Sequence, residues 1–372
     1  MSYWAWLARM VFFSVLGGAS LLFWFRTTPS EPQSQEESFL MPQAQVVPFE
    51  GHPLTRANSN YQPVRGKLPP VPKSRLAPLQ TYEAYSASLP DAASQSTQSS
   101  PSSQTNRATS RSQLSQTATS PTQSAQSRSA HSSPSATTPP RPSQPSAPPF
   151  NLAASLSRYA GLFENPISLG MLAIGVAEGN YRVFVESSTL YVEQTSLYFG
   201  HTDPGNLSWG ERVTNYGPCS DQGRSDGDIS VAEQMCLQRS RDRLPTNLQD
   251  LADAGINPNS DVEAVINTAD LYNQASPVHS RLFPQALQMA YQGGLTGVEA
   301  MAWARTASFY VDSNKRLDLQ NGRNVASGLL GICARERRAV TEWECVYADQ
   351  LRRAKAVASV LDKYFEVYAP RS

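Results

Sequence analysis

One long stretch of the chain lacks the residues that a folded domain needs. Residues 93–149 contain no acidic residue and no Phe, Trp or Tyr, and consist mostly of Ser, Thr, Gln, Pro and Ala. Such a composition buries too little apolar surface to offset the entropy of ordering the backbone. We expect a disordered Pro/Ser/Gln/Thr-rich linker over residues 27–149. As a coil of about 125 residues it would span on the order of 60 Å. The short Pro-rich pieces at 46–49 and 68–72 are linker or partner motifs.

The sequence also lacks a basic run of the kind that binds nucleic acid, so nucleic acid is not an expected partner. The 31 basic and 31 acidic residues cancel overall, but residues 1–150 hold 11 of the basic and 6 of the acidic ones. The first part of the chain is therefore basic, and the rest is acidic.

The N-terminus holds a long apolar run. As a helix, residues 3–25 would extend roughly 35 Å, enough for a bilayer core of about 30 Å. Tryptophans stand near both ends of the run, as they do at membrane interfaces. A cleaved signal peptide is the alternative, but the small residues 17–20 are followed by further apolar residues, which favours retention. We predict a transmembrane anchor in residues 1–26, with the C-terminal domain in the periplasm.

The chain has only four cysteines, all after residue 150, and no Cys-x-x-Cys pair. That spacing argues against zinc, and we expect no metal and no cofactor. An even set outside the cytoplasm favours disulfides over buried thiols, although sequence alone leaves three pairings open. We predict Cys219–Cys236 and Cys333–Cys345, because each pair closes a local loop. The second pair requires a helix break, since one straight helix would hold its cysteines about 18 Å apart.

After residue 150 the pattern predicts a mainly helical α+β domain over 150–372 with one small sheet. Asn151 is suited to cap a short helix that runs to residue 163. An apolar helix over 167–178 ends at Gly179. Strands are expected at 183–185, at 190–192 and around 197–199. Ser/Thr-x-x-Glu capping boxes predict further helix starts at Ser230, Ser260, Thr296 and Thr341.

Two features point to chemistry. Glu178 ends the apolar helix, and apolar neighbours favour the protonated carboxyl that a general acid needs. The alternative is a solvated glutamate at a helix end. The second feature is the polar, glycine-rich segment 198–206, which is either a plain turn or a loop that lines a cleft. Asp270 and Asn273 share one helix face. Trp303 is expected in the core, and Arg305 is expected on the helix surface.

The segments AIGVAEGN (173–180), YFGHTDPGN (198–206), DLYNQASP (270–277) and GLTGVEAMAWARTASF (294–309) resemble the lysozyme-like domain of bacterial cell-wall muramidases. The resemblance extends over 167–319 and is closest to envelope proteins with AEG and GHTDPGN motifs. It implies a lysozyme-like fold, with Glu178 as the catalytic acid and peptidoglycan glycan strands as the substrate. By position it implies a substrate-binding wall that comprises Tyr198, His201, Asp203 and Asn206.

The resemblance implies a muramidase or a lytic transglycosylase that cleaves peptidoglycan. The alternative is a non-catalytic cell-wall-binding or envelope-interaction module on the same fold. Glu186, Glu193 and Asp203 are candidates for a second carboxylate, which a transglycosylase does not need. After residue 206 the chain departs from the family pattern, and this leaves the substrate contacts of that wall open. A groove or a second carboxylate beside Glu178 would favour the enzyme.

Overall fold

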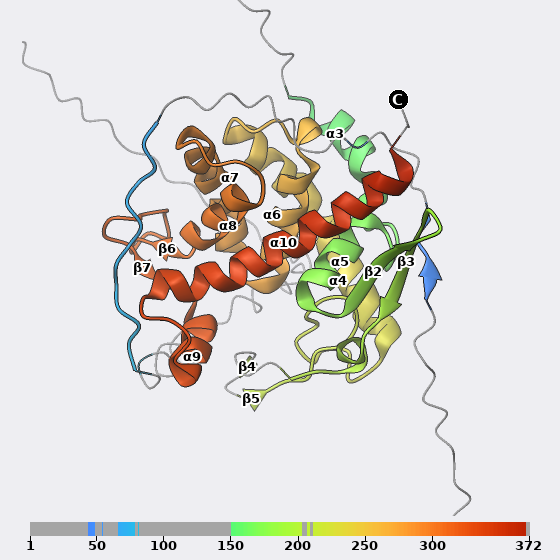
Figure 1. Ribbon diagram of the computed structural model, residues 1–372, viewed down its shortest axis with the longest axis horizontal. Helices are drawn as coiled ribbons and strands as arrows, with labels where there is room; N and C mark the ends of the chain where they lie inside the picture. The colour runs from blue at the N-terminus through green and yellow to red at the C-terminus, as the bar shows by residue number, and fades with distance from the viewer. Residues whose placement is uncertain are drawn as a thin grey trace, which may run out of the picture.

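The computed structural model describes residues 44–48, 54, 66–78, 81, 150–202, 207–208 and 211–369. Within these residues the chain forms an α+β fold, mainly helical, with a small antiparallel sheet (Figure 1). The predicted anchor over 1–26 and most of the predicted linker lie outside the described residues. None of the described helices combines the length and the apolar character that crossing a bilayer requires.

The helices of the described residues are α3 (Leu152–Tyr159), α4 (Leu169–Glu178), α5 (Ile229–Asp253), α6 (Val262–Gln274), α7 (Pro277–Gln292), α8 (Gly297–Ala307), α9 (Ser327–Glu336) and α10 (Glu342–Tyr368). Single 3-10 turns are η2 (Ala160–Phe163), η3 (Ser196–Phe199) and η4 (Pro258–Ser260). The strands are β1 (Gln45–Val46), β2 (Tyr181–Glu186), β3 (Thr189–Gln194), β4 (Leu207–Ser208), β5 (Glu211–Arg212), β6 (Tyr310–Val311) and β7 (Arg323–Asn324).

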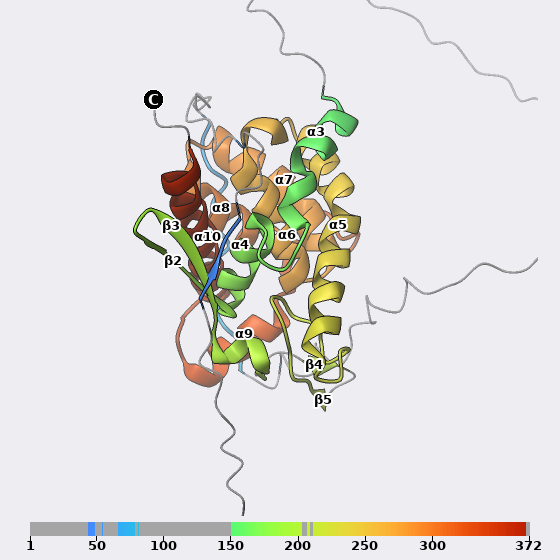
Figure 2. The ribbon, with the colours of Figure 1, turned by 90° about the vertical axis from the view of Figure 1, so that its right-hand side faces the viewer.

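The long helix α10 organises the helical part of the domain. It crosses the other helices and packs against α8 and α4, while α6 lies among α4, α5 and α7 (Figures 1 and 2). Helices α4 and α6 are buried along nearly their whole length. A helix that is apolar on all sides needs neighbours on all sides, and this places α4 in the centre of the domain.

The end of α4 follows its local sequence. Gly179 adopts a left-handed backbone with φ 91°, and this ends the helix at Glu178 as predicted. Asn180 is buried, and its Nδ2 donates to the Gly217 carbonyl at 2.9 Å. The chain then enters the β2–β3 hairpin, which confirms two of the predicted strands.

The third predicted strand, around 197–199, is wrong. These residues form the 3-10 turn η3, because the Thr195 side chain accepts a hydrogen bond from the Leu197 N–H at 3.2 Å and starts a tight turn. The third strand of the sheet is β1, which pairs antiparallel with β3. Its neighbour Val47 is 1% exposed, and its N–H donates to the Leu190 carbonyl at 2.9 Å.

Part of the predicted linker therefore belongs to the fold, which corrects the expectation for 27–149. Besides β1, residues 66–78 run along the opposite side of the domain, past β6 and β7 (Figure 1). The Gly66 N–H donates to Gln292 and the Leu76 N–H donates to Val340, each at 3.0 Å. Both pieces contain the Pro-rich apolar patches of the sequence. The average composition of the long segment conceals these patches, and each is long enough to pack.

The predicted disulfides are confirmed. Cys219–Cys236 and Cys333–Cys345 both form, and the described residues leave no free cysteine. The required helix break lies between α9 and α10, where Thr341 and Glu344 form the predicted capping box. Thr296 is the N-cap residue of α8, as predicted, but its side chain makes no capping hydrogen bond. The boxes at Ser230 and Ser260 are wrong by one or two residues, because aspartates cap α5 and α6 instead.

Candidate functional site

Glu178 is held in a bidentate ion pair at the centre of the domain. Its Oε1 accepts from Arg353 Nη2 at 2.7 Å, and its Oε2 accepts from Nη1 at 3.1 Å. Arg353 comes from α10, and the adjacent Arg352 donates from Nη1 to the Ala177 carbonyl at 2.9 Å. Two neighbouring arginines of α10 therefore fix the C-terminal end of α4, where carbonyl groups lack helical partners.

Arg353 also joins Glu178 to a second carboxylate. Its Nε donates to Asp270 Oδ2 at 2.9 Å, and its Nη2 donates to Asp270 Oδ1 at 2.5 Å. Asp270, on α6, also pairs with Arg305 Nη2 at 2.7 Å. We call Glu178, Arg353, Asp270 and Arg305 the buried charge network. It holds two carboxylates and two guanidinium groups, so its charges balance.

Neutral side chains complete this network. Gln350 Oε1 accepts from Arg305 Nε at 2.7 Å, and Gln274 Oε1 accepts from Nη2 at 3.0 Å. Burial alone would raise the pKa of Asp270, but the two guanidinium groups outweigh it and lower that pKa. Burial alone would lower the pKa of Arg353, but Asp270 and Glu178 outweigh it and raise that pKa well above its ordinary value. Asp270 and Arg353 therefore hold one another in their charged forms.

This geometry differs from the expectation for Glu178. The sequence predicts a protonated carboxyl among apolar neighbours, whereas the structure brings a guanidinium against both of its oxygens. The side chain of Glu178 is 11% exposed and that of Arg353 is 3% exposed. Asp270 and Arg305 are fully buried. Glu178 is thus the end of the buried charge network that faces solvent.

The segment after β3 contributes less to the site than its polar sequence suggests. Tyr198 is fully buried, its ring lies 5.2 Å from that of Tyr181, and its hydroxyl donates to Glu233. His201 Nδ1 lies 2.8 Å from the Leu197 carbonyl, and its backbone pairs with Asn215. The predicted contacts Asp203 and Asn206 lie outside the described residues.

The two described candidates for a second carboxylate, Glu186 and Glu193, form no interaction with Glu178 in the structure, and Asp203 lies outside the described residues. Glu193 pairs on the surface with Arg182, whose Nε donates to its Oε2 at 2.8 Å. Glu186 is exposed at the end of β2. The carboxylate that the structure brings next to Glu178 is Asp270, which shares the same Arg353 nitrogen.

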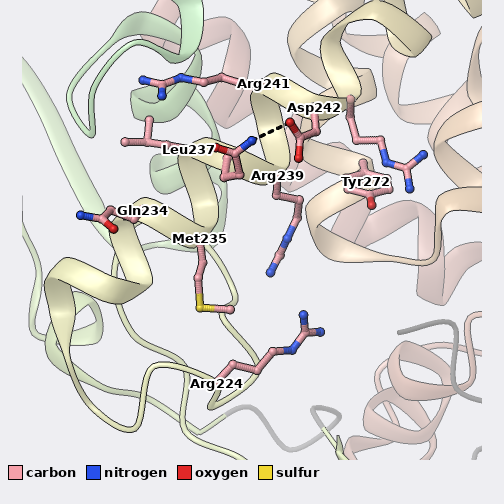
Figure 3. A pocket seen from close by; sticks show the side chains of 10 residues that line it. Arg224, Gln234, Met235, Leu237, Arg239, Arg241, Asp242 and Tyr272 are labelled. Carbon is pink, nitrogen blue, oxygen red and sulfur yellow. Dashed lines mark hydrogen bonds between the residues drawn. The ribbon is translucent and has the colours of Figure 1, made fainter. Parts of the chain in front are cut away.

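A groove of about 820 Å³ lies along one face of α5 (Figure 3). This volume falls within the usual range of ligand sites. Residues of α5 form one wall, Tyr272 of α6 forms another, and Arg224 projects from the loop before α5. The Cys219–Cys236 disulfide ties this loop to α5.

The groove is basic. Four arginines line it, and Asp242 is its one acidic lining residue among those the structure describes. Arg239 Nη1 donates to the Ser220 carbonyl at 2.9 Å and to Asn273 Oδ1 at 3.3 Å, and this fixes the guanidinium in place. Burial and the charge of Arg224 lower the pKa of Arg239, and the Glu178 carboxylate is near enough to oppose that effect. The charge of Glu178 thus acts on Arg239, although Glu178 is not one of the residues that line the groove.

Sequence reasoning missed Arg353 and misplaced Arg305, which is fully buried rather than on a helix surface. A signal for Arg353 was available in α10. Buried residues recur there every three or four positions, and Arg353 stands in that series. Its neighbour Arg352 stands outside the series, and its side chain is 54% exposed. A charged residue on the apolar face of a helix indicates a buried partner.

Comparisons of the chain with protein-family models, with curated proteins and with solved structures found no match. Function therefore has to be inferred from the site itself.

Proposed function

We propose that this protein is a membrane-tethered, lysozyme-like enzyme that cleaves the glycan strands of peptidoglycan, with Glu178 as its general acid. The observation that supports the proposal is the position of Glu178. It ends a central helix just before a small hairpin, it keeps 11% side-chain exposure, and its charge acts on Arg239, which lines a groove of about 820 Å³. In the envelope proteins that the motifs resemble, the acid occupies the same place in the order of elements.

A general acid must carry a proton when the glycosidic bond breaks. In this structure Arg353 donates a hydrogen bond to each oxygen of Glu178. When a sugar ring covers Glu178 and excludes water, burial favours its neutral form. Arg353 keeps two hydrogen bonds to Asp270 in that event. Asp270 is then the single carboxylate shared by Arg353 and Arg305, so proton uptake by Glu178 leaves the network with one net positive charge.

The second candidate function is a cell-wall-binding module without turnover. The bidentate contact between Arg353 and Glu178 favours it, because an ionised carboxylate cannot donate a proton. A basic groove beside such a pair would still retain a glycan strand. The two candidates share the ligand and differ in whether a bond is broken.

The deciding experiment incubates the detergent-solubilised full chain with purified murein and measures both bound protein and released soluble fragments. Wild type should release fragments, and Glu178→Gln should release them at least about 100-fold more slowly while binding murein equally well. Glu193→Gln, which changes a half-buried glutamate on β3 that pairs with Arg182, is the matched control and should keep full activity. Reducing ends among the products indicate hydrolysis, whereas anhydro ends indicate transglycosylation.

Two outcomes would change the assignment. Wild type that binds murein and releases nothing would establish the binding module. A Glu178→Gln variant as active as wild type would show that the chemistry lies elsewhere.

The location in the cell is part of the proposal. The apolar run over 3–25 supports a retained anchor, with the domain in the periplasm. N-terminal sequencing of the mature protein should find a start at or near Met1. A start between residues 21 and 33 would show that the run is a cleaved signal.

A further inference from the structure

Two arginines face one another across the groove. Figure 3 shows the side chain of Arg239 directed from α5 into the open space, with Arg224 directed toward it from the opposite loop. Two like charges at such a position repel one another and gain stability from a shared anion.

Neither guanidinium forms an ion pair within the described part of the chain. Arg239 donates from Nη1 to two neutral oxygens, and its Nε and Nη2 make no hydrogen bond to a described residue. Arg224 donates from Nη2 to the neutral Gln222 side chain. No carboxylate of the described residues lies within ion-pair distance of either arginine. Their charges therefore remain available to a ligand.

The neighbouring side chains limit what kind of anion fits. Tyr272 lines the groove beside Arg239, and the Arg243 guanidinium lies over its ring at 4.6 Å from the centroid. Met235 of α5 also lines the groove. An aromatic ring and a thioether next to paired guanidinium groups suit a ligand with both apolar atoms and a planar anionic group. A guanidinium group is planar and can donate two parallel hydrogen bonds to the two oxygens of a carboxylate.

We propose that Arg224 and Arg239 bind a carboxylate of the peptide stem that peptidoglycan carries on its glycan strand. The inference rests on the proposed function, since it names the part of that substrate which the groove recognises. A glycan chain without stems lacks the carboxylates of the peptide and bears only the lactyl carboxylate that lies directly on each muramic acid. The groove thereby distinguishes stem-bearing strands from bare strands.

The test measures binding of the full chain in detergent to two soluble probes. One probe is the disaccharide that carries its peptide stem, and the other is the same disaccharide after an amidase has removed the peptide, which loses the stem carboxylates and gains only the lactyl carboxylate on the sugar. We expect wild type to bind the stem-bearing probe about tenfold more tightly, as one or two charge-assisted hydrogen bonds would give. Added salt should reduce that preference.

Arg224→Gln should remove the preference without changing the affinity for the bare disaccharide. Arg224 is exposed, so this variant is expected to fold. Arg239→Lys is the second variant: it keeps the charge, loses the fixed planar donor, and should weaken the preference in part. Arg182→Gln, which changes an exposed arginine on β2, is the matched control and should bind both probes as wild type does.

The outcomes separate the inference from the proposed function. If Arg224→Gln keeps the preference, or if wild type binds both probes equally while still releasing fragments from murein, the carboxylate site is wrong and the proposed function stands. If wild type binds neither probe nor murein, both proposals are wrong.

Discussion

The buried charge network makes a sharp prediction about stability. Asp270→Asn keeps the size and shape of the side chain but removes the negative charge that two arginines share. Asp270 accepts from Arg353 at 2.9 and 2.5 Å and pairs with Arg305 at 2.7 Å. In the variant the network would hold two guanidinium groups and one carboxylate, so one positive charge would be buried without compensation.

The burial of the partners determines the size of the effect. Arg305 and Asp270 are fully buried, and the side chain of Arg353 is 3% exposed, so water cannot replace the lost carboxylate. Removing one partner of such a pair typically costs about 3–5 kcal/mol. A single domain has a total unfolding free energy of only about 5–15 kcal/mol. Asp270→Asn should therefore remove about a fifth or more of the stability.

Asp250→Asn is the matched control. Asp250 pairs with Arg281 at 3.1 Å, but the Arg281 side chain is 62% exposed, and such pairs contribute about 1 kcal/mol or less. Urea unfolding at pH 7, followed by tryptophan fluorescence, gives both values. The double variant Asp270→Asn with Arg305→Gln, which removes one charge of each sign, should recover part of the loss. If the two single variants differ by less than about 1 kcal/mol, the charges of the network are not coupled as the geometry indicates.

Further predictions concern pH, the disulfides and the N-terminal segments. Burial lowers the pKa of His279 below its ordinary value of 6.5, so the unfolded chain gains a proton at a higher pH than the folded chain does. Stability should therefore fall as the pH drops below about 6.5, and His279→Gln should show a flatter dependence in urea titrations between pH 7 and 5. Replacing both cysteines of Cys333–Cys345, which lie 12 residues apart, should lower the unfolding free energy by about 3 kcal/mol, and an unchanged urea midpoint would contradict the loop-entropy estimate. Val47→Asp should expose residues 44–48 to protease, whereas the conservative Val47→Ile should not.

Features that depend on neighbouring residues could be predicted from the sequence. The stop of α4 at Gly179, the capping box at Thr341 and both disulfides each depend on residues within a short span. Strand β1 could not be found in this way, because its partner Tyr191 lies 145 positions along the chain from Val46. A two-residue strand has no period of its own to detect.

The site was predictable in part for the same reason. Glu178 was identified from its helix and the glycine after it, which are local signals. Its partner Arg353 comes from a helix 175 positions later, and the composition around Glu178 contains no trace of it. The local apolar pattern therefore indicated a neutral carboxyl, and tertiary structure supplied a counter-ion instead.

The N-terminal segments change how far the domain can lie from the proposed membrane anchor. With residues 44–48 packed on β3, only residues 27–43 separate the anchor from the domain. Such a segment extends to roughly 60 Å at most, and as a coil it spans about 20–25 Å. Residues 79–149 connect one part of the domain to another, because residues 66–78 and 150 both belong to it. Their length therefore adds nothing to the reach. Deleting part of residues 93–149 should leave the distance between anchor and domain unchanged in a fluorescence-transfer measurement from membrane to domain, whereas lengthening 27–43 should increase it.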